Sequence, residues 1–171
     1  LAGATSAGLL ITGPGTAFGS AANSRIRLGV IGGGGRGTFT TEQFVAHGGY
    51  EIAAIADAFA DKADAFGEKF GVPAAKRYVG LDGYKAMLAG GSVDAVHVVS
   101  PAWFHNQQAA AAVDAGVHVF VAKPVAVDVP GVRAFEDTAS RAAARKLTVM
   151  VDFQTQGDEL YQEGIRRVHS G

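Results

Sequence analysis

A run of glycines gives this chain its clearest chemical signature. The apolar segment 26–31 leads directly into Gly32-Gly33-Gly34-Gly35-Arg36-Gly37. Under the spacing G-x-G-x-x-G, Gly32 permits a tight turn, Gly34 lets the backbone approach a diphosphate, and Gly37 lets the next helix pack closely on the strand. The free N–H groups and the positive dipole end of that helix would face the phosphates. The run therefore predicts a dinucleotide-phosphate site.

A carboxylate follows at the distance that such a site requires. The apolar segment 50–55 ends in Ala56-Asp57, about 20 residues after the last glycine of the run. A carboxylate there accepts hydrogen bonds from the ribose hydroxyls of the adenosine and repels a 2′-phosphate. No Arg or Lys occurs in Ala58-Phe59-Ala60, so NAD is favoured over NADP. The alternatives for Asp57 are an N-cap of the helix that starts near Asp61 or an ordinary turn residue.

A parallel sheet with crossover helices would position these residues. Apolar runs alternate with helix-like segments along the chain, and Gly or Pro marks each boundary. The predicted strands are 26–31, 50–55, 77–79, 94–99, 117–121 and 147–153, and the predicted helices are 39–46, 61–70, 84–88, 106–115 and 130–145. Six strands with right-handed crossovers predict an α/β, doubly wound parallel sheet of strand order 3-2-1-4-5-6.

Ligands of such a sheet bind beyond the carboxyl ends of its strands, where this chain is rich in polar and aromatic residues. The last three predicted strands end in Ser100-Pro101-Ala102-Trp103-Phe104-His105, Ala122-Lys123-Pro124 and Asp152-Phe153-Gln154-Thr155-Gln156. A lysine between a strand end and a proline, partly desolvated beside a cofactor, can act as an acid or base towards a hydroxyl. The alternative for Lys123 is a surface lysine at a strand end.

The other candidates at these strand ends also have two interpretations each. His105 is either part of the wall of the cofactor site or a solvent-facing residue at a helix start. Trp103 and Phe104 either flank the nicotinamide or fill the rim of the sheet. Gln154 either bonds the cofactor amide or a substrate hydroxyl, or makes ordinary loop hydrogen bonds.

Three segments give the sequence a specific resemblance to a known family. They match in order and spacing, cover 25–156, and are Gly29 to Gly37, Val98-Val99-Ser100-Pro101 with His105, and Gly116 to Phe120 leading into Lys123-Pro124. The chain resembles the family of glucose-fructose oxidoreductase and inositol dehydrogenase, usually written Gfo/Idh/MocA. The resemblance implies an NAD(P)-binding Rossmann domain at 25–156. It also implies a larger α/β substrate domain, of which this chain holds only the start at 157–171.

The same resemblance implies roles for individual residues. Lys123 corresponds to the lysine of the family's Glu-Lys-Pro motif, which lies near the nicotinamide and the reacting hydroxyl of a sugar or polyol. This chain has Ala122 where the family usually has Glu, so any role of that glutamate in positioning the lysine or the cofactor is missing at this position. Lys123 is the expected catalytic residue. The residues expected at the cofactor are Gly32, Gly34, Gly35, Arg36, Gly37, Asp57, Ser100, Pro101, Trp103, His105, Lys123 and Gln154.

The expected function is that of an oxidoreductase which passes a hydride between a sugar or polyol carbon and NAD, while Lys123 assists the proton of the hydroxyl. The missing domain is expected to supply a partner histidine and the contacts of a homo-oligomer. The chain alone should bind NAD but turn over little. The alternatives are an NAD-dependent glycosidase of the same superfamily, a non-catalytic NAD-binding module and, on the glycine run alone, a methyltransferase.

Composition excludes several other functions. The 171 residues are 48% hydrophobic with a net charge of −1 and no cysteine, which excludes disulfides, thiolate metal sites and a cysteine nucleophile. No basic stripe suited to nucleic acid occurs. His97 and His118 alternate with apolar residues and are interpreted as interior or edge residues. No histidine pair has metal-ligand spacing with a carboxylate, so no metal site is expected.

The two ends of the chain differ from its middle. Residues 1–24 are rich in Ala, Gly, Ser and Thr around the apolar patch Leu9-Leu10-Ile11. This is typical of the back half of an export signal and predicts a periplasmic or exported protein; the alternative is a disordered leader of a cytoplasmic protein. The leader is too broken by Gly13-Pro14-Gly15 to span a bilayer, so no membrane contact is expected. At the other end, apolar residues at helical spacing predict a helix over 160–170.

Overall fold

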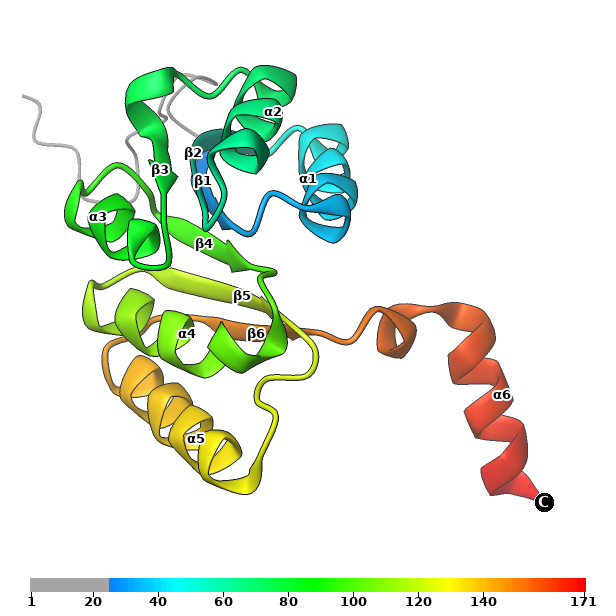
Figure 1. Ribbon diagram of the computed structural model, residues 1–171. Helices are drawn as coiled ribbons and strands as arrows, with labels where there is room; N and C mark the ends of the chain where they lie inside the picture. Colours follow the sequence, from blue (N-terminus) through cyan, green and yellow to red (C-terminus); the bar gives the residue numbers. More distant parts are fainter. Residues whose placement is uncertain (1–24) are drawn as a thin grey trace, which may run out of the picture.

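One parallel sheet organises the computed structural model, which describes residues 25–171 apart from the side chain of Gln156. Its strand order, β3-β2-β1-β4-β5-β6, confirms the doubly wound α/β fold and the order predicted from the sequence (Figure 1). The predicted leader 1–24 lies outside the described residues. The strands are β1 (Ile26–Ile31), β2 (Tyr50–Asp57), β3 (Arg77–Val79), β4 (Ala95–Val98), β5 (His118–Ala122) and β6 (Val149–Asp152).

The helices alternate with the strands, as the sequence predicts. They are α1 (Gly35–His47), α2 (Ala60–Phe70), α3 (Gly83–Ala89), α4 (His105–Asp114), α5 (Val129–Ala144) and α6 (Glu159–Ser170), with short 3-10 turns η2 (Ala74–Lys76), η3 (Ala102–Phe104) and η4 (Gln154–Gly157). Helix α1 starts at Gly35 instead of residue 39 because the last residues of the glycine run already take helical geometry. The tight approach of this helix to β1 is what puts the loop at the edge of the sheet.

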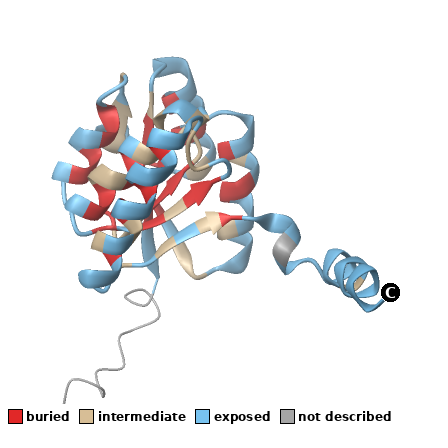
Figure 2. Cartoon of the chain, turned by 90° about the horizontal axis from the view of Figure 1, so that it is seen from below, coloured by how far each residue is buried: buried red, intermediate tan, exposed pale blue. Residues whose placement is uncertain are grey.

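Different helices cover the two faces of the sheet. On one face α3, α4 and α5 bury Met87, Val113 and Phe135 against β4 and β5. On the other face α2 and part of α1 cover β1 and β2, where Leu28 and Phe66 are buried. Figure 2 shows the buried residues concentrated in the strands and on the inner sides of these helices. A strand covered on both faces needs apolar side chains in both directions, which explains the near-continuous apolar runs of the sequence.

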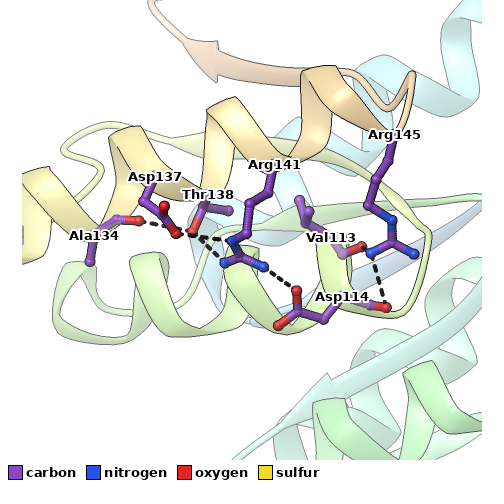
Figure 3. A network of polar contacts seen from close by, with 7 residues as sticks. All are labelled: Val113, Asp114, Ala134, Asp137, Thr138, Arg141 and Arg145. Carbon is purple, nitrogen blue, oxygen red and sulfur yellow. Dashed lines mark hydrogen bonds and ion pairs between the residues drawn. The ribbon is translucent and has the colours of Figure 1, made fainter.

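Two arginines of the α5 segment lock this helix against α4 (Figure 3). Arg141 pairs with Asp137 at 3.0 Å on its own helix and with Asp114 at the end of α4. Arg145 donates to the carbonyl oxygens of Val113 and Asp114, the last of which lies 3.2 Å away. The Val113 carbonyl oxygen also accepts a hydrogen bond of 3.0 Å from the Gly116 N–H. A positive charge at this carboxyl end of α4 interacts favourably with the helix dipole. The pairs are solvent-accessible, so they set the alignment of the two helices more than they add stability.

Helix α6 extends away from the sheet at the end of the chain (Figure 1). It confirms the helix predicted over 160–170, and it buries none of its own residues. Its apolar side chains are exposed: Leu160, Tyr161, Ile165 and Val168. That this helix starts a further domain stays a prediction. Among the residues described, no helix is both long enough and apolar enough to cross a membrane.

His97 on β4 is a fully buried polar residue beneath α1, which confirms its interpretation as an interior residue. Its Nε2 lies 2.8 Å from Thr40 Oγ1 and its Nδ1 lies 3.3 Å from the carbonyl oxygen of Phe120. Burial lowers the pKa of His97 to about 4, while the Phe120 carbonyl and Asp152 oppose the shift and Arg36 adds to it. The imidazole is therefore neutral in the folded protein near pH 7.

The stability of the protein should therefore fall as pH drops from 6.5 to about 4. The unfolded chain takes up a proton on His97 at higher pH than the folded chain, so each pH unit in this window costs about 1.4 kcal/mol of unfolding free energy. Urea denaturation of the wild type and of His97→Gln at pH 7, 5.5 and 4.5 checks this. The difference in unfolding free energy between the two proteins should be largest at pH 7 and shrink by about 3 kcal/mol towards pH 4. A constant difference over the whole range would contradict it.

Candidate functional site

A cavity of about 600 Å³ opens at the carboxyl edge of the sheet, between the glycine run, the end of β2 and the segment after β4. Eight of the sequence-predicted residues line it: Gly32, Gly34, Gly35, Arg36, Gly37, Asp57, Ser100 and Pro101. The lining contains residues that the sequence analysis missed: Phe59, Lys62, Leu81, Tyr84 and Gln108. Their signal in the sequence is weak, because they come from turns and helix starts that only the strand order brings to the same edge.

The glycines of the run do different things in the structure. Gly32 has φ of 110°, and a Cβ there would lie 2.8 Å from the Ser100 backbone nitrogen. A Cβ on Gly37 would overlap the carbonyl oxygen of Gly32, so α1 can start against the end of β1 only with glycine at this position. At Gly34 and Gly35, by contrast, a Cβ meets no atom within 4 Å. Gly32 and Gly37 shape the turn, whereas Gly34 and Gly35 leave open space beside the cavity.

The start of α1 presents backbone N–H groups without a competing partner. The first N–H groups of any α-helix lack acceptors within the helix. Gly34 is the N-cap residue, no described side chain caps this end, and the first turn holds no acidic residue. The helix dipole adds a partial positive charge at the same point. Together with the open space above Gly34 and Gly35, this end of α1 is suited to a phosphate.

Asp57 links the glycine run to the turn after β2. Its Oδ2 accepts a hydrogen bond of 2.7 Å from the Gly33 N–H, and its Oδ1 accepts one of 3.0 Å from the Phe59 N–H. The N-cap of α2 is Phe59, so Asp57 is not the cap of that helix. The carboxylate is partly buried and lines the cavity. Lys62, in the first turn of α2, brings a positive charge to the same rim. It follows Ala58-Phe59-Ala60, the segment in which the sequence has no Arg or Lys.

His105 connects the segment after β4 with the segment after β5. The side chain is 2% exposed, and its Nε2 lies 2.6 Å from the Ser100 carbonyl oxygen. Its Nδ1 lies 2.8 Å from the carbonyl oxygen of Pro124. The residue is buried, so it is not a solvent-facing residue at a helix start, and its two contacts join the segments after β4 and β5. Its place in the wall of the cofactor site stays a prediction. Ser100 Oγ in turn donates to Gln108 at 2.6 Å.

Lys123 and Trp103 lie outside the cavity lining. Trp103 is 65% exposed and lies over a separate hollow at the start of α5, while its neighbour Phe104 lines the cavity. Lys123 follows β5, is joined to Pro124 by a cis peptide bond, and is exposed. No described residue among 25–171 covers the side chain, so its partial desolvation beside a bound cofactor stays a prediction. No hydrogen bond or ion pair engages its ammonium within this part of the chain.

Arg36 makes the polar connection between α1 and the end of β6. Its Nη2 lies 2.5 Å from Asp152 Oδ2 and 2.5 Å from Gln154 Oε1. Gln154 therefore makes a protein contact and lines a second hollow with Arg36, Phe39 and Asp152 instead of the main cavity. Asp152 was not singled out from the sequence, although it ends a strand as Asp57 does. Among the described residues, no group of three His, Asp or Glu side chains could hold a metal ion.

Known proteins match most of this chain and are themselves about three times as long as the matched region. A protein named Glycosyl hydrolase family 109 protein from Shewanella sp. is 33% identical over 138 residues, which is 78% of this chain and 30% of that protein. D-xylose 1-dehydrogenase (NADP(+)) 2 of Haloferax volcanii is 34% identical over 98 residues, which is 57% of this chain and 29% of the dehydrogenase. The chain thus spans less than a third of these curated relatives.

The fold is also found in solved structures. The crystal structure of scyllo-inositol dehydrogenase from Lactobacillus casei with bound NAD(H) and scyllo-inositol superposes with a TM-score of 0.71 at 28% identity. The match covers 86% of this chain and 42% of the dehydrogenase. The family model described as "Oxidoreductase family, NAD-binding Rossmann fold" matches residues 26–153. With the cavity, the glycine run and the strand order in agreement, the chain belongs to the Gfo/Idh/MocA oxidoreductase family, as its sequence resemblance predicts.

Proposed function

We propose that this chain is the cofactor-binding part of an oxidoreductase that transfers a hydride between a carbinol carbon of a sugar or polyol and NAD. The observation that carries the proposal is the 2.7 Å hydrogen bond from the Gly33 N–H to Asp57 Oδ2 at the cavity. This bond holds the glycine run and the acid of the neighbouring strand in one fixed arrangement. A phosphate-binding turn beside a ribose-binding acid is the combination that dinucleotides require.

Backbone groups and one carboxylate would hold the cofactor. The N–H groups at the start of α1 would donate to the diphosphate, with Gly34 and Gly35 leaving room for it. Asp57 uses one lone pair of each oxygen on the backbone, so further lone pairs remain for the ribose hydroxyls. The cavity of about 600 Å³ falls in the range of about 300–1,000 Å³ typical of small-molecule sites.

NAD is the proposed cofactor in preference to NADP. A 2′-phosphate would meet the Asp57 carboxylate, which two backbone N–H groups hold at the rim and prevent from swinging away. Lys62 acts in the opposite direction, because an ammonium at the same rim attracts a phosphate. The carboxylate is held by hydrogen bonds while Lys62 is exposed and free to move, so the repulsion outweighs the attraction.

Replacing Asp57 should therefore change both affinity and preference. Asp57→Ala in the complete protein should weaken NAD binding by about 10- to 100-fold, the range expected for loss of hydrogen bonds to a charged group. NADP binding should weaken less or improve, because Lys62 then acts unopposed. Isothermal calorimetry with both cofactors measures this, with Asp61→Ala, which removes an exposed acid in the first turn of α2, as the control. Equal losses for NAD and NADP would rule out the proposed discrimination, and no NAD binding by the wild type would rule out the cofactor itself.

Lys123 is the proposed acid/base of the reaction. It stands at the carboxyl end of β5, exposed and without a partner among residues 25–171, so its amine is available to a substrate held by the rest of the complete protein. NAD, when bound, supplies the hydride acceptor. As the C–H hydride leaves the carbinol carbon, the amine of Lys123 takes the hydroxyl proton and the carbon–oxygen double bond forms. In the reverse direction the ammonium returns that proton.

Removing this amine should affect turnover and leave cofactor binding intact. Lys123→Ala in the complete protein should lower kcat for NADH formation by about 10²- to 10⁴-fold, the usual contribution of a positioned acid or base. Its Kd for NAD should stay within about threefold, since Lys123 lies outside the lining of the cavity. Absorbance at 340 nm and calorimetry check the two parts, with exposed Lys69→Ala as the matched control. A non-catalytic NAD-binding module, the alternative favoured by Ala122, would lose no turnover.

One alternative activity is favoured by a specific observation. A relative that matches 78% of this chain at 33% identity is named a glycosyl hydrolase. In a glycosidase that oxidises and then reduces its sugar, the same site would cleave a glycoside without net redox change. Incubating the complete protein with NAD and nitrophenyl glycosides distinguishes the two activities. Release of nitrophenol at constant absorbance at 340 nm identifies the glycosidase, whereas a rise at 340 nm with a free sugar or polyol identifies the dehydrogenase.

Export and assembly are proposals on separate grounds. The uncharged, Ala- and Ser-rich residues 1–24 support export to the periplasm. A reporter fused behind these residues and found wholly in the cytoplasm would remove that proposal. The exposed apolar side chains of α6 support a further domain after the sheet, through which the complete protein would form a homo-oligomer.

A further inference from the structure

A nearly buried carboxylate lies directly beside the position where this chain lacks the family's glutamate. Asp152 ends β6 and is 9% exposed. In the pairing of β5 with β6, its Cα partner is Ala122, the residue before Lys123. Partners in neighbouring parallel strands are about 4.8 Å apart and direct their side chains to the same face of the sheet. The Asp152 carboxylate thus lies over the face to which a side chain at position 122 would point.

The partner of this carboxylate belongs to the glycine run. Arg36 Nη2 lies 2.5 Å from Asp152 Oδ2, and the same nitrogen lies 2.5 Å from Gln154 Oε1. Arg36 is in the first turn of α1 and lines the main cavity. A largely buried carboxylate needs such a partner, because an unpaired one is strongly destabilised. The pair therefore connects the phosphate end of the site to the ends of β5 and β6.

The strand order places the Arg36–Asp152 pair on the side of the nicotinamide half of the proposed cofactor. With the diphosphate at the end of β1 and the adenosine ribose at Asp57 on β2, the other half extends over β4, β5 and β6. Arg36 stands at the boundary between these halves, and Asp152 lies beyond it on the side of Lys123, at the end of β6. Asp57 and Asp152 thus occupy strand ends on opposite sides of the glycine run.

We propose that Asp152, from the neighbouring strand, supplies the carboxylate that this chain lacks at position 122, and that it positions Arg36 for the nicotinamide half of the dinucleotide. The inference rests on the proposed function and goes beyond it, because it assigns a positioning residue and explains how Ala122 is tolerated. Alanine leaves room for the Arg36–Asp152 pair, and a glutamate at 122 beside Asp152 would put two carboxylates on one guanidinium.

The inference is tested by removing the carboxylate at position 152 and placing one at position 122. Four variants of the complete protein are needed: Asp152→Ala, Asp152→Ala with Ala122→Glu, Asp152→Ala with Ala122→Gln, and Ala122→Glu alone. Binding is measured by calorimetry with NADH and with ADP-ribose, which lacks the nicotinamide. Asp152→Ala should weaken NADH binding about tenfold and leave ADP-ribose within about twofold, since a charged hydrogen-bonding partner is lost on one half only.

Glutamate at position 122 should restore NADH affinity in the Asp152→Ala background to within about threefold of the wild type, whereas glutamine of the same length should not. Ala122→Glu alone should weaken NADH binding, because two carboxylates then share Arg36. Equal loss of NADH and ADP-ribose affinity, or equal rescue by Glu and Gln, would overturn the inference and assign the pair a structural role only.

Two further measurements keep the outcome clear. If Asp152→Ala fails to fold, Asp152→Asn, with and without Ala122→Glu, replaces it, because the amide keeps the shape and loses only the charge. Asp94→Ala breaks an Arg–Asp pair of 2.6 Å to Arg27 at the amino ends of β1 and β4, away from the cavity, and should change neither affinity. A wild type that binds neither NADH nor ADP-ribose would refute the proposed function itself, a result distinct from loss of both affinities in the variant only.

Discussion

The close approach of α1 to the end of β1 is the constraint on which the site depends. A Cβ on Gly37 would overlap the Gly32 carbonyl oxygen, so only glycine lets the helix begin at this point. The approach aims the free N–H groups of α1 at the sheet edge and brings Gly33 within 2.7 Å of the Asp57 carboxylate. The same turn puts Arg36 within reach of Asp152 across two intervening strands, β4 and β5. One steric condition thus sets the positions of two acids that lie on different strands.

The two acids, Asp57 and Asp152, differ in the kind of group that holds each carboxylate. Asp57 is held by backbone N–H groups, which cannot move independently of the fold, so its carboxylate is a fixed acceptor at the cavity. Asp152 is held by a side chain that is itself partly exposed, so its arrangement depends on Arg36 and on Gln154. Beneath Arg36 and Asp152, His97 stays neutral because burial lowers its pKa to about 4. A neutral layer below the charged pair leaves the Arg36–Asp152 attraction without a competing cation.

Much of the fold could be predicted from the sequence because local signals agree with one another. The strand order and the alternation of helices are confirmed, since continuous apolar runs with glycine boundaries are specific to a covered parallel sheet. The predicted start of the first helix, residue 39, is four residues later than the observed start at Gly35, because the low helix propensity of glycine argues against a helix in the glycine run. At the site, the partners of the His105 side chain do not follow from the sequence, because one of them, the Pro124 carbonyl oxygen, belongs to the segment after another strand.

By itself the sequence determined the glycine turn, the acid after the second strand and the family, because each depends on residue type at a fixed local spacing. Only the tertiary structure decided which strand-end residues share the cavity. It directs Ser100 towards Gln108, leaves Trp103 and Lys123 outside the lining, and sets Asp152 in register with Ala122. The physical reason is that strand register and crossover packing arise from the whole core, so neighbours across strands carry no signal in the spacing of either segment alone.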